Sequence, residues 1–274
     1  MLPFEKTKDH LICIDSDGTI MDTMTIKHER CFGPMFLVAF DIVDNIDDIL
    51  REWNDINLYS LKRGINRFQG LKEILTYIRK YGYDFEGEEE FFEWVDTTNE
   101  FSARLLSEIN KDNHNDCIRR ALAWSKLVND EITRLPPSNA FDGVKEILEK
   151  ASLEADLVGV SSANKDAVNE EWTRLNIKNL FRFVACQDVG TKARIIESTL
   201  ENGYKKSNTI MLGDALGDLK AATDNGVWFF PIIPSKETYS WKKFLEEGLV
   251  KFLNDEFDSE YQKEVIDEFK ASLK

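Results

Sequence analysis

Two pairs of aspartates stand directly after short apolar runs, and residues placed in this way can do chemistry. The run LICI leads into Asp15 and Asp17, and the run IML leads, through one glycine, into Asp214 and Asp218. Such evenly apolar runs are typical of strands buried on both faces of a parallel sheet, and the carboxyl ends of those strands bind ligands. Carboxylates gathered there would raise one another's pKa unless a cation lay between them, and Mg²⁺ prefers oxygen ligands of this kind. The sequence therefore predicts a magnesium site at which these four acids converge.

Two further positions, between the acidic pairs, suit a phosphate group. Ser161, Ser162 and Ala163 follow the apolar run LVGV and precede a helical pattern, where hydroxyls and free backbone N–H groups can hold an anion. Lys192 stands at the start of the next helical pattern, where a fixed cation could hold a nucleophile and phosphoryl oxygens together. The nucleotide-binding patterns GxxxxGK and GxGxxG are absent from the sequence. An EF-hand calcium loop is also excluded, because isoleucines stand where its glycine and glutamate would be needed.

The segments that carry these residues predict an α/β fold with a doubly wound, Rossmann-like parallel sheet. From residue 150 onward, strand-like segments alternate with helical patterns, and the first apolar run supplies one more strand. The predicted strands are Leu11–Ile14, Leu157–Val160, Phe183–Cys186, Thr209–Leu212 and Val227–Ile233, and the predicted helices between them are Lys165–Leu175, Lys192–Asn202 and Asp218–Asp224.

The chain between the first strand and the rest of the sheet has a different character. Residues 23–138 have almost no β-branched runs, show several helical periods and end at the sequence Pro-Pro-Ser. We expect 1–22 and 139–234 to form one α/β core and 23–138 to form a helical insertion over its ligand-binding end. Residues 235–274 show two amphipathic helical patterns, which we expect to pack on the core.

Composition limits the classes of partner. The net charge of −15 weighs against nucleic acids and anionic membranes, both of which attract basic surfaces, but it does not exclude a small anionic substrate held by local positive charge. The four cysteines form no CxxC pair, which indicates reduced thiols. No signal-peptide pattern and no apolar run near the ~20 residues of a membrane span occur, so we expect a cytoplasmic protein.

In order and spacing, these elements resemble the four motifs of the haloacid dehalogenase (HAD) superfamily. The matching features are DSDGT, a strand that ends in serine, a lysine before a helix, and GDxxxD. The helical insertion after the first motif resembles the C1-type cap of members such as phosphoglycolate phosphatase and β-phosphoglucomutase. The resemblance implies that Asp15 is a nucleophile that forms an aspartyl-phosphate and that Asp17 is a general acid and base.

The resemblance also implies the remaining site residues. Mg²⁺ would be bound by Asp15, by the backbone carbonyl of Asp17, and by Asp214 with the help of Asp218. Ser162 and the neighbouring Ala163 would contact a phosphoryl oxygen whose charge Lys192 offsets, with Ser161 as the alternative serine. These phosphate-binding residues would act on a small phosphorylated metabolite.

Asp17 favours phosphate-ester chemistry over the dehalogenase and phosphonatase reactions, in which no ester oxygen has to be protonated. The resemblance therefore implies a phosphatase, and a β-phosphoglucomutase-like sugar-phosphate mutase remains the nearest alternative. A phospho-accepting regulatory domain is a more distant one, since it usually has adjacent acids on its first strand and lacks a large insertion.

The segment SLKRGINRF in the insertion places Lys62, Arg63 and Arg67 around one glycine. Clusters of this kind are usually solvated, yet in an acidic protein they also suit an anion-binding loop. Arg63 and Arg67 are therefore possible substrate contacts from the cap. The oligomeric state cannot be inferred from the sequence.

Overall fold

The computed structural model describes residues 1–273, and one part of it is built on a five-stranded parallel sheet. The strands are β1 (His10–Ile14), β2 (Ala155–Val160), β3 (Phe183–Ala185), β4 (Thr209–Gly213) and β5 (Trp228–Pro231). Their order in the sheet is β3-β2-β1-β4-β5. The chain therefore adds β2 and β3 on one side of the central β1, and then β4 and β5 on the other side. The predicted doubly wound α/β fold is confirmed, with its switch point beside β1.

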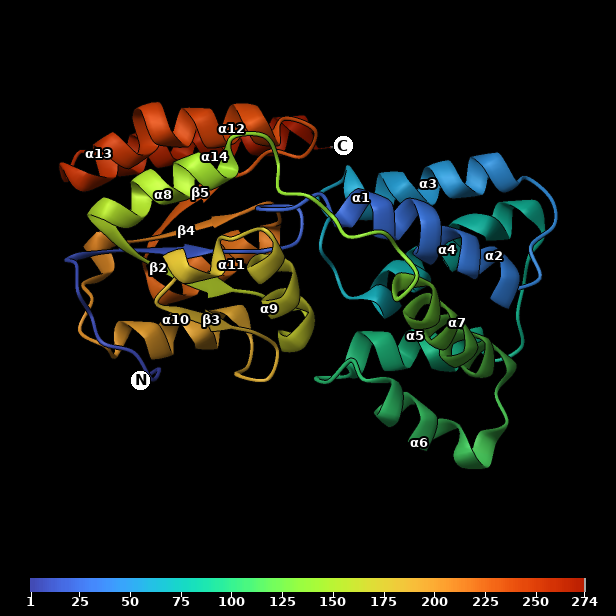
Figure 1. Cartoon of the computed structure of the whole chain (residues 1–274). Coiled ribbons are helices and arrows are strands. Elements are labelled where there is room, and N and C mark those ends of the chain that lie inside the picture. Colours follow the sequence, from blue (N-terminus) through green and yellow to red (C-terminus); the bar gives the residue numbers. More distant parts are fainter. Residues whose placement is uncertain (274) are drawn as a thin grey trace. The chain divides into compact units, whose positions relative to one another are not determined.

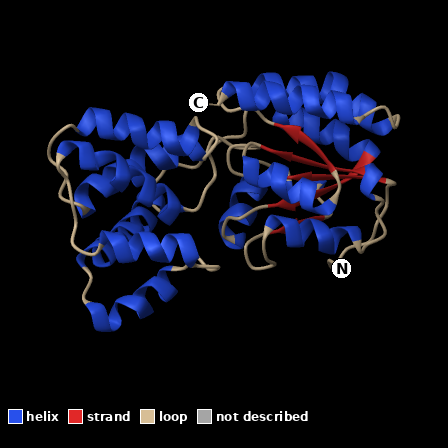
Figure 2. Ribbon diagram, turned by 180° about the vertical axis from the view of Figure 1, so that it is seen from behind, coloured by secondary structure: helices blue, strands red, loops and turns tan. Residues whose placement is uncertain are grey.

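Both faces of the sheet are covered by helices, which explains why its strands are uniformly apolar (Figure 2). A hydrophobic cluster lies on each face of the sheet. Along β1, Ile12 and Ile14 belong to the cluster on one face, whereas Leu11 and Cys13 belong to the cluster on the opposite face. Strand β1 pairs with β2 on one side and with β4 on the other, in registers that place Ile14 beside Gly159 and Leu212. The carboxyl ends of β1 and β4 therefore meet at one edge.

The helices form two layers around the sheet (Figure 1). On the face that includes Ile12 lie the elements α8 (Val144–Glu154), α9 (Lys165–Arg174), α12 (Glu237–Lys243), the π-helical η5 (Phe244–Gly248) and α13 (Leu249–Leu253). On the other face lie α10 (Lys192–Leu200) and α11 (Leu216–Asn225). Helix α14 (Ser259–Ser272) packs against the edge strand β5. Short 3₁₀ turns, η3 (Lys178–Leu180) and η4 (Lys206–Asn208), precede β3 and β4. Within residues 1–273, no helix has both the length and the apolar character that a membrane crossing requires.

The chain divides into two compact units, the one just described and a helical unit, Met24–Pro136. The helical unit contains α1 (Met24–Lys27), the π-helical η1 (His28–Phe32), α2 (Gly33–Ala39), α3 (Ile46–Leu58), α4 (Arg67–Ile78), η2 (Arg79–Tyr81), α5 (Glu88–Thr97), α6 (Ala103–Asn113) and α7 (Asp116–Ile132). It has a hydrophobic core of its own, in which Trp53 and Trp124 are fully buried. The chain passes between the two units after Thr23 and after Pro136.

Candidate active site

The first acidic pair lies in a tight loop that continues β1. The Asp15 N–H donates to the Leu212 carbonyl at 3.0 Å, which extends the pairing of β1 with β4 by one residue. The chain then turns sharply, because the Ser16 carbonyl accepts from the N–H groups of Ile20 and Met21 at 2.9 and 3.2 Å. Gly18 has a φ of 79°, a conformation that side chains disfavour. The loop of residues 15–21, hereafter the Asp15 loop, is thus fixed by its own backbone, and Asp15 is only 5% exposed.

The second acidic pair is positioned by a glycine at the end of β4. A Cβ atom on Gly213 would lie 2.3 Å from the carboxyl carbon of Asp218, so only glycine leaves room for that side chain. Asp218 is fully buried in the first turn of α11, where its Oδ2 accepts from the Ala215 N–H at 3.1 Å. Asp214, also buried, accepts at its Oδ1 from the Thr19 hydroxyl at 3.1 Å. The Thr19 hydroxyl of the DSDGT sequence therefore joins the Asp15 loop to the second acidic pair.

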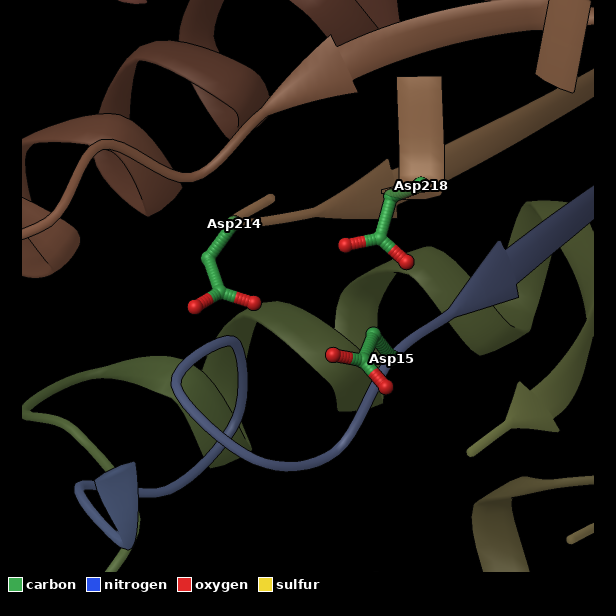
Figure 3. A group of neighbouring side chains, drawn as sticks. All are labelled: Asp15, Asp214 and Asp218. Atoms are coloured by element: carbon green, nitrogen blue, oxygen red, sulfur yellow. The ribbon is translucent and has the colours of Figure 1, made fainter. Parts of the chain in front are cut away.

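Three carboxylates converge at the carboxyl ends of β1 and β4 (Figure 3). Asp15, Asp214 and Asp218 each place one carboxylate oxygen within 4.8 Å of those of the other two. The Lys192 Nζ lies 2.9 Å from an Asp15 oxygen and 2.6 Å from an Asp218 oxygen. Residues from three separate segments of the chain thus form one cluster, in which the three carboxylates are buried and Lys192 is half-buried.

The pKa values in this cluster follow from burial and from the three like charges. Burial raises the pKa of Asp15 well above its usual range, the Lys192 ammonium opposes this rise, and the carboxylates of Asp218 and Asp214 add to it. Burial raises the pKa of Asp218 in the same way. Burial alone would lower the pKa of Lys192, but Asp15 and Asp218 raise it above its usual value. Lys192 therefore stays protonated and offsets one of the three negative charges.

The donor set fits a divalent cation. Three buried carboxylates and one ammonium sum to two negative charges, which is costly in a site of low polarity. Oxygen ligands from a few carboxylates are what Mg²⁺ selects. Asp15, Asp214 and Asp218 are the described acids whose atoms are close enough together to share an ion.

Asp214 should contribute more to metal affinity than Asp218. Asp214 directly follows β4, whereas Asp218 lies in the first turn of α11 and is engaged by Lys192 at Oδ1 and by the Ala215 N–H at Oδ2. We expect Asp214→Ala to weaken Mg²⁺ binding at least about tenfold, as loss of an oriented metal ligand typically does, and Asp218→Ala to weaken it less. Isothermal titration of the metal-free variants with Mg²⁺ measures both, and an equal or reversed order would contradict the assignment.

Asp17 points its carboxylate elsewhere. Its side chain is partly exposed and accepts a hydrogen bond from the buried Thr23 hydroxyl. It is not one of the three clustered acids, and its role as general acid and base stays a prediction. The contribution of Asp17 to metal binding through its backbone carbonyl stays a prediction.

The two serines after β2 differ in burial. Ser161 is 1% exposed, its N–H continues the ladder to the Ala185 carbonyl at 3.0 Å, and its Oγ accepts from the Ala163 N–H at 3.1 Å. Ser162 is exposed, and α9 begins three residues later, after the Asn164 side chain caps it. Which serine contacts phosphate stays a prediction, but only Ser161 has its hydroxyl oriented by the turn that ends the strand.

The two predicted cap arginines are held by groups of their own unit. Arg63 is 4% exposed, and its Nη1 donates to the Leu58 carbonyl at 2.9 Å. The Arg67 Nη1 donates to Asn129 Oδ1 at 2.9 Å and to Ser125 Oγ at 3.2 Å. Their part in substrate binding stays a prediction. The sequence motifs that contain Thr19 and Gly213 predict no role for these two residues. Trp172 and Trp241, which donate hydrogen bonds to the Asp15 loop, show only the sequence pattern of core residues.

This combination of a doubly wound sheet and an acidic cluster at its switch point defines an α/β protein with a ligand site at the strand ends. The sequence model of the haloacid dehalogenase-like hydrolases matches residues 87–232, which is more than half of the chain. The chain belongs to this family, as the four motifs predicted.

Solved structures agree on the fold. A haloacid dehalogenase-like hydrolase from Streptococcus pneumoniae superposes with a TM-score of 0.53 at 12% identity, covering 84% of this chain and 90% of that one. A candidate phosphoglycolate phosphatase from Lactobacillus delbrueckii subsp. bulgaricus gives 0.51 at 14% identity, covering 83% and 87%. A candidate β-phosphoglucomutase from Bacteroides vulgatus gives 0.51 at 13% identity, covering 93% of each chain. A search of curated protein sequences found no match.

Proposed function

We propose that this protein is a Mg²⁺-dependent phosphatase that hydrolyses a small phosphate monoester through an aspartyl-phosphate on Asp15. The observation that carries the proposal is the buried cluster of Asp15, Asp214 and Asp218 around Lys192 at the switch point of the sheet. A nucleophilic carboxylate beside a fixed ammonium and a cation site is suited to attack on a phosphoryl group, which is itself anionic.

Each step uses residues of the core. A carboxylate oxygen of Asp15 attacks phosphorus, the bond from phosphorus to the ester oxygen breaks, and the leaving oxygen takes a proton from the Asp17 carboxyl group. Water then attacks the aspartyl-phosphate and gives a proton to Asp17, which frees phosphate and restores Asp15. Bound Mg²⁺, held by Asp15, the Asp17 carbonyl, Asp214 and Asp218, would supply charge neutralisation between nucleophile and phosphoryl group.

Lys192 and a serine complete the proposed phosphate contacts. Lys192 holds one Asp15 oxygen in place and adds positive charge where negative charge develops. We favour Ser161 over Ser162 for the hydroxyl contact because Ser161 is fixed at the end of the strand next to β1. Ser161→Ala should then lower kcat/KM more than Ser162→Ala does.

A panel of phosphate monoesters tests the function. With Mg²⁺ present, we expect free phosphate to be released from at least one member, and release should stop when EDTA removes the metal. The alternative, a sugar-phosphate mutase, is favoured by the likeness to the candidate β-phosphoglucomutase, and it predicts an isomerised sugar phosphate with little free phosphate. Turnover by the metal-free protein, verified by elemental analysis, would overturn the proposed site.

Asp17→Asn should retain Mg²⁺ binding and lose much of kcat. The ligand at this position is a backbone carbonyl, whereas the lost carboxyl group supplies the proton for the leaving oxygen. General acid–base catalysis contributes about 10²- to 10⁴-fold, so we expect a loss of that size on an alkyl phosphate. The loss on a nitrophenyl phosphate should be smaller, because its leaving oxygen needs little protonation. A loss under threefold on the alkyl ester would remove Asp17 from this role.

The cap arginines should act on KM if they contact the leaving group. Loss of a charge-assisted hydrogen bond costs about 1.5 to 3 kcal/mol, which is roughly 10- to 150-fold in kcat/KM. We expect Arg67→Ala to show such a loss, mainly in KM, on an anionic or hydroxyl-rich substrate and almost none on nitrophenyl phosphate.

Two comparisons keep the test of the cap arginines specific. Arg63→Ala needs a parallel measurement of thermal stability, because Arg63 is buried and bonded to backbone. Arg104→Ala, which removes an exposed arginine elsewhere in the same unit, should change neither parameter. Equal losses on both substrates for Arg67→Ala would mean that Arg67 supports folding or phosphate chemistry instead.

A further inference from the structure

Two buried indole groups donate hydrogen bonds to the Asp15 loop. The Nε1–H of Trp241 donates to the Thr19 carbonyl at 2.8 Å, and the Nε1–H of Trp172 donates to the Ser16 hydroxyl at 3.1 Å. Both tryptophans are fully buried. A buried carbonyl that loses its donor has no water to replace it, so these bonds fix the loop more firmly than exposed ones would.

Trp241 comes from a part of the chain that the family match does not include. The match ends at residue 232, whereas Trp241 lies in α12, in the C-terminal extension. This helix is tied to the strand ends, because the Ile232 N–H donates to the Gly213 carbonyl at 2.8 Å and the Ile233 N–H donates to the Ser240 hydroxyl at 3.0 Å. The indole of Trp241 is therefore positioned by the carboxyl end of β4, which also positions Asp214.

Thr19 connects this indole to the acidic cluster. Its carbonyl accepts from Trp241, and its hydroxyl donates to Asp214 Oδ1 at 3.1 Å. Thr19 is fully buried, so a change in the position of its backbone must be followed by its side chain. Movement of Thr19 would consequently disturb a hydrogen bond that Asp214 accepts.

We propose that Trp241 of the C-terminal extension is a positioning residue, whose indole N–H fixes the Asp15 loop at Thr19 and, through the Thr19 hydroxyl, orients Asp214. The effect on the loop depends on hydrogen bonds alone. The effect on Asp214 as a metal ligand rests on the proposed function. The extension then positions the Asp15 loop as well as contributing to the hydrophobic core.

Trp241→Phe keeps the ring and removes the donor, and Trp228→Phe is its matched control. The Trp228 Nε1–H also donates to a backbone carbonyl, that of Ser207, at 3.0 Å, but far along the chain from the Asp15 loop. In metal-free protein we expect the amides of Ile20 and Met21 to exchange with solvent about 3- to 10-fold faster in Trp241→Phe and within twofold of wild type in Trp228→Phe. Unchanged exchange in Trp241→Phe, or an equal rise in the control, would overturn the proposal.

The wild-type protein provides a second measurement that is independent of whether the variant folds. If the indole holds the loop, the opening that breaks its bond to the Thr19 carbonyl also breaks the bonds from the Ile20 and Met21 amides to the Ser16 carbonyl. After correction for intrinsic rates, the Trp241 indole N–H should therefore exchange within about threefold of the Ile20 and Met21 amides. A tenfold difference would show that the indole and the loop open separately, which contradicts the proposal.

Mn²⁺ binding, followed by electron paramagnetic resonance of the free ion, tests the link to Asp214. We expect the dissociation constant to rise about 3- to 10-fold in Trp241→Phe and to stay within twofold of wild type in Trp228→Phe. Faster loop exchange with unchanged Mn²⁺ affinity would overturn the link to Asp214. If wild-type protein bound no Mn²⁺, the proposed metal site would fail, whereas the effect on the loop would be judged by hydrogen exchange alone.

Discussion

Asp15→Asn should lower the turnover of a phosphate monoester at least about 10⁴-fold while leaving the protein folded. The amide has the shape of the carboxylate but cannot attack phosphorus, and the loss of a nucleophile removes covalent catalysis altogether. Folding should be nearly unaffected, because burial disfavours the charged form of Asp15 and a neutral side chain avoids that cost. Steady-state phosphate release and urea denaturation measure the two quantities.

Asp22→Asn is the matched control for this variant. Asp22 lies seven residues further along the chain, is exposed, and stands outside the acidic cluster. Its substitution should leave kcat within twofold of wild type. Near-normal activity of Asp15→Asn would eliminate the aspartyl-phosphate mechanism, and a loss of folding would mean that the charge of Asp15 is needed to balance Lys192.

The acidic cluster could be predicted from the sequence because its members are set by strand ends. Asp15 and Asp214 follow apolar runs that belong to neighbouring parallel strands, so the sheet itself brings them together. The sequence places Lys192 at the start of a helical pattern, and in the structure it is the first residue of α10. Positions of this kind depend on backbone topology, which local patterns in the sequence reveal.

Contacts made by single side chains across long separations could not be predicted. Trp241 lies 222 residues from Thr19, and its helical spacing shows only that it is apolar and buried. Gly159 is similar, since its lack of a side chain makes room for the ring of Trp172, a requirement that no local pattern announces. The orientation of Arg67 toward Ser125 and Asn129 likewise depends on how α4 packs beside α7, which the sequence of neither helix specifies.

Lys192→Met should destabilise the metal-free protein by about 3 to 5 kcal/mol of unfolding free energy at pH 8. The substitution keeps most of the length of the side chain but leaves Asp15 and Asp218 buried without their shared cation, and breaking a buried ion pair has a cost of this size. Catalysis should fall as well, because the ammonium no longer orients Asp15. Urea denaturation in EDTA measures the stability, and added Mg²⁺ should recover part of it because the cation replaces the lost charge.

The dependence on pH distinguishes loss of charge from loss of packing. Burial raises the folded-state pKa of Asp15 and Asp218 above the unfolded value, so their ionisation opposes folding progressively as the pH rises from the unfolded pKa through the folded one. Without Lys192 this penalty grows, so the stability deficit of Lys192→Met should be larger at pH 8 than at pH 5.

Adding Asp218→Asn to Lys192→Met removes one uncompensated carboxylate and should restore at least about 1 kcal/mol at pH 8. Lys165→Met, which removes an exposed lysine paired with Asp188 at 3.3 Å, should change stability by under about 0.5 kcal/mol at both pH values. A deficit of Lys192→Met that is equal at the two pH values, and that Asp218→Asn does not relieve, would assign the effect to packing and refute the electrostatic role of Lys192.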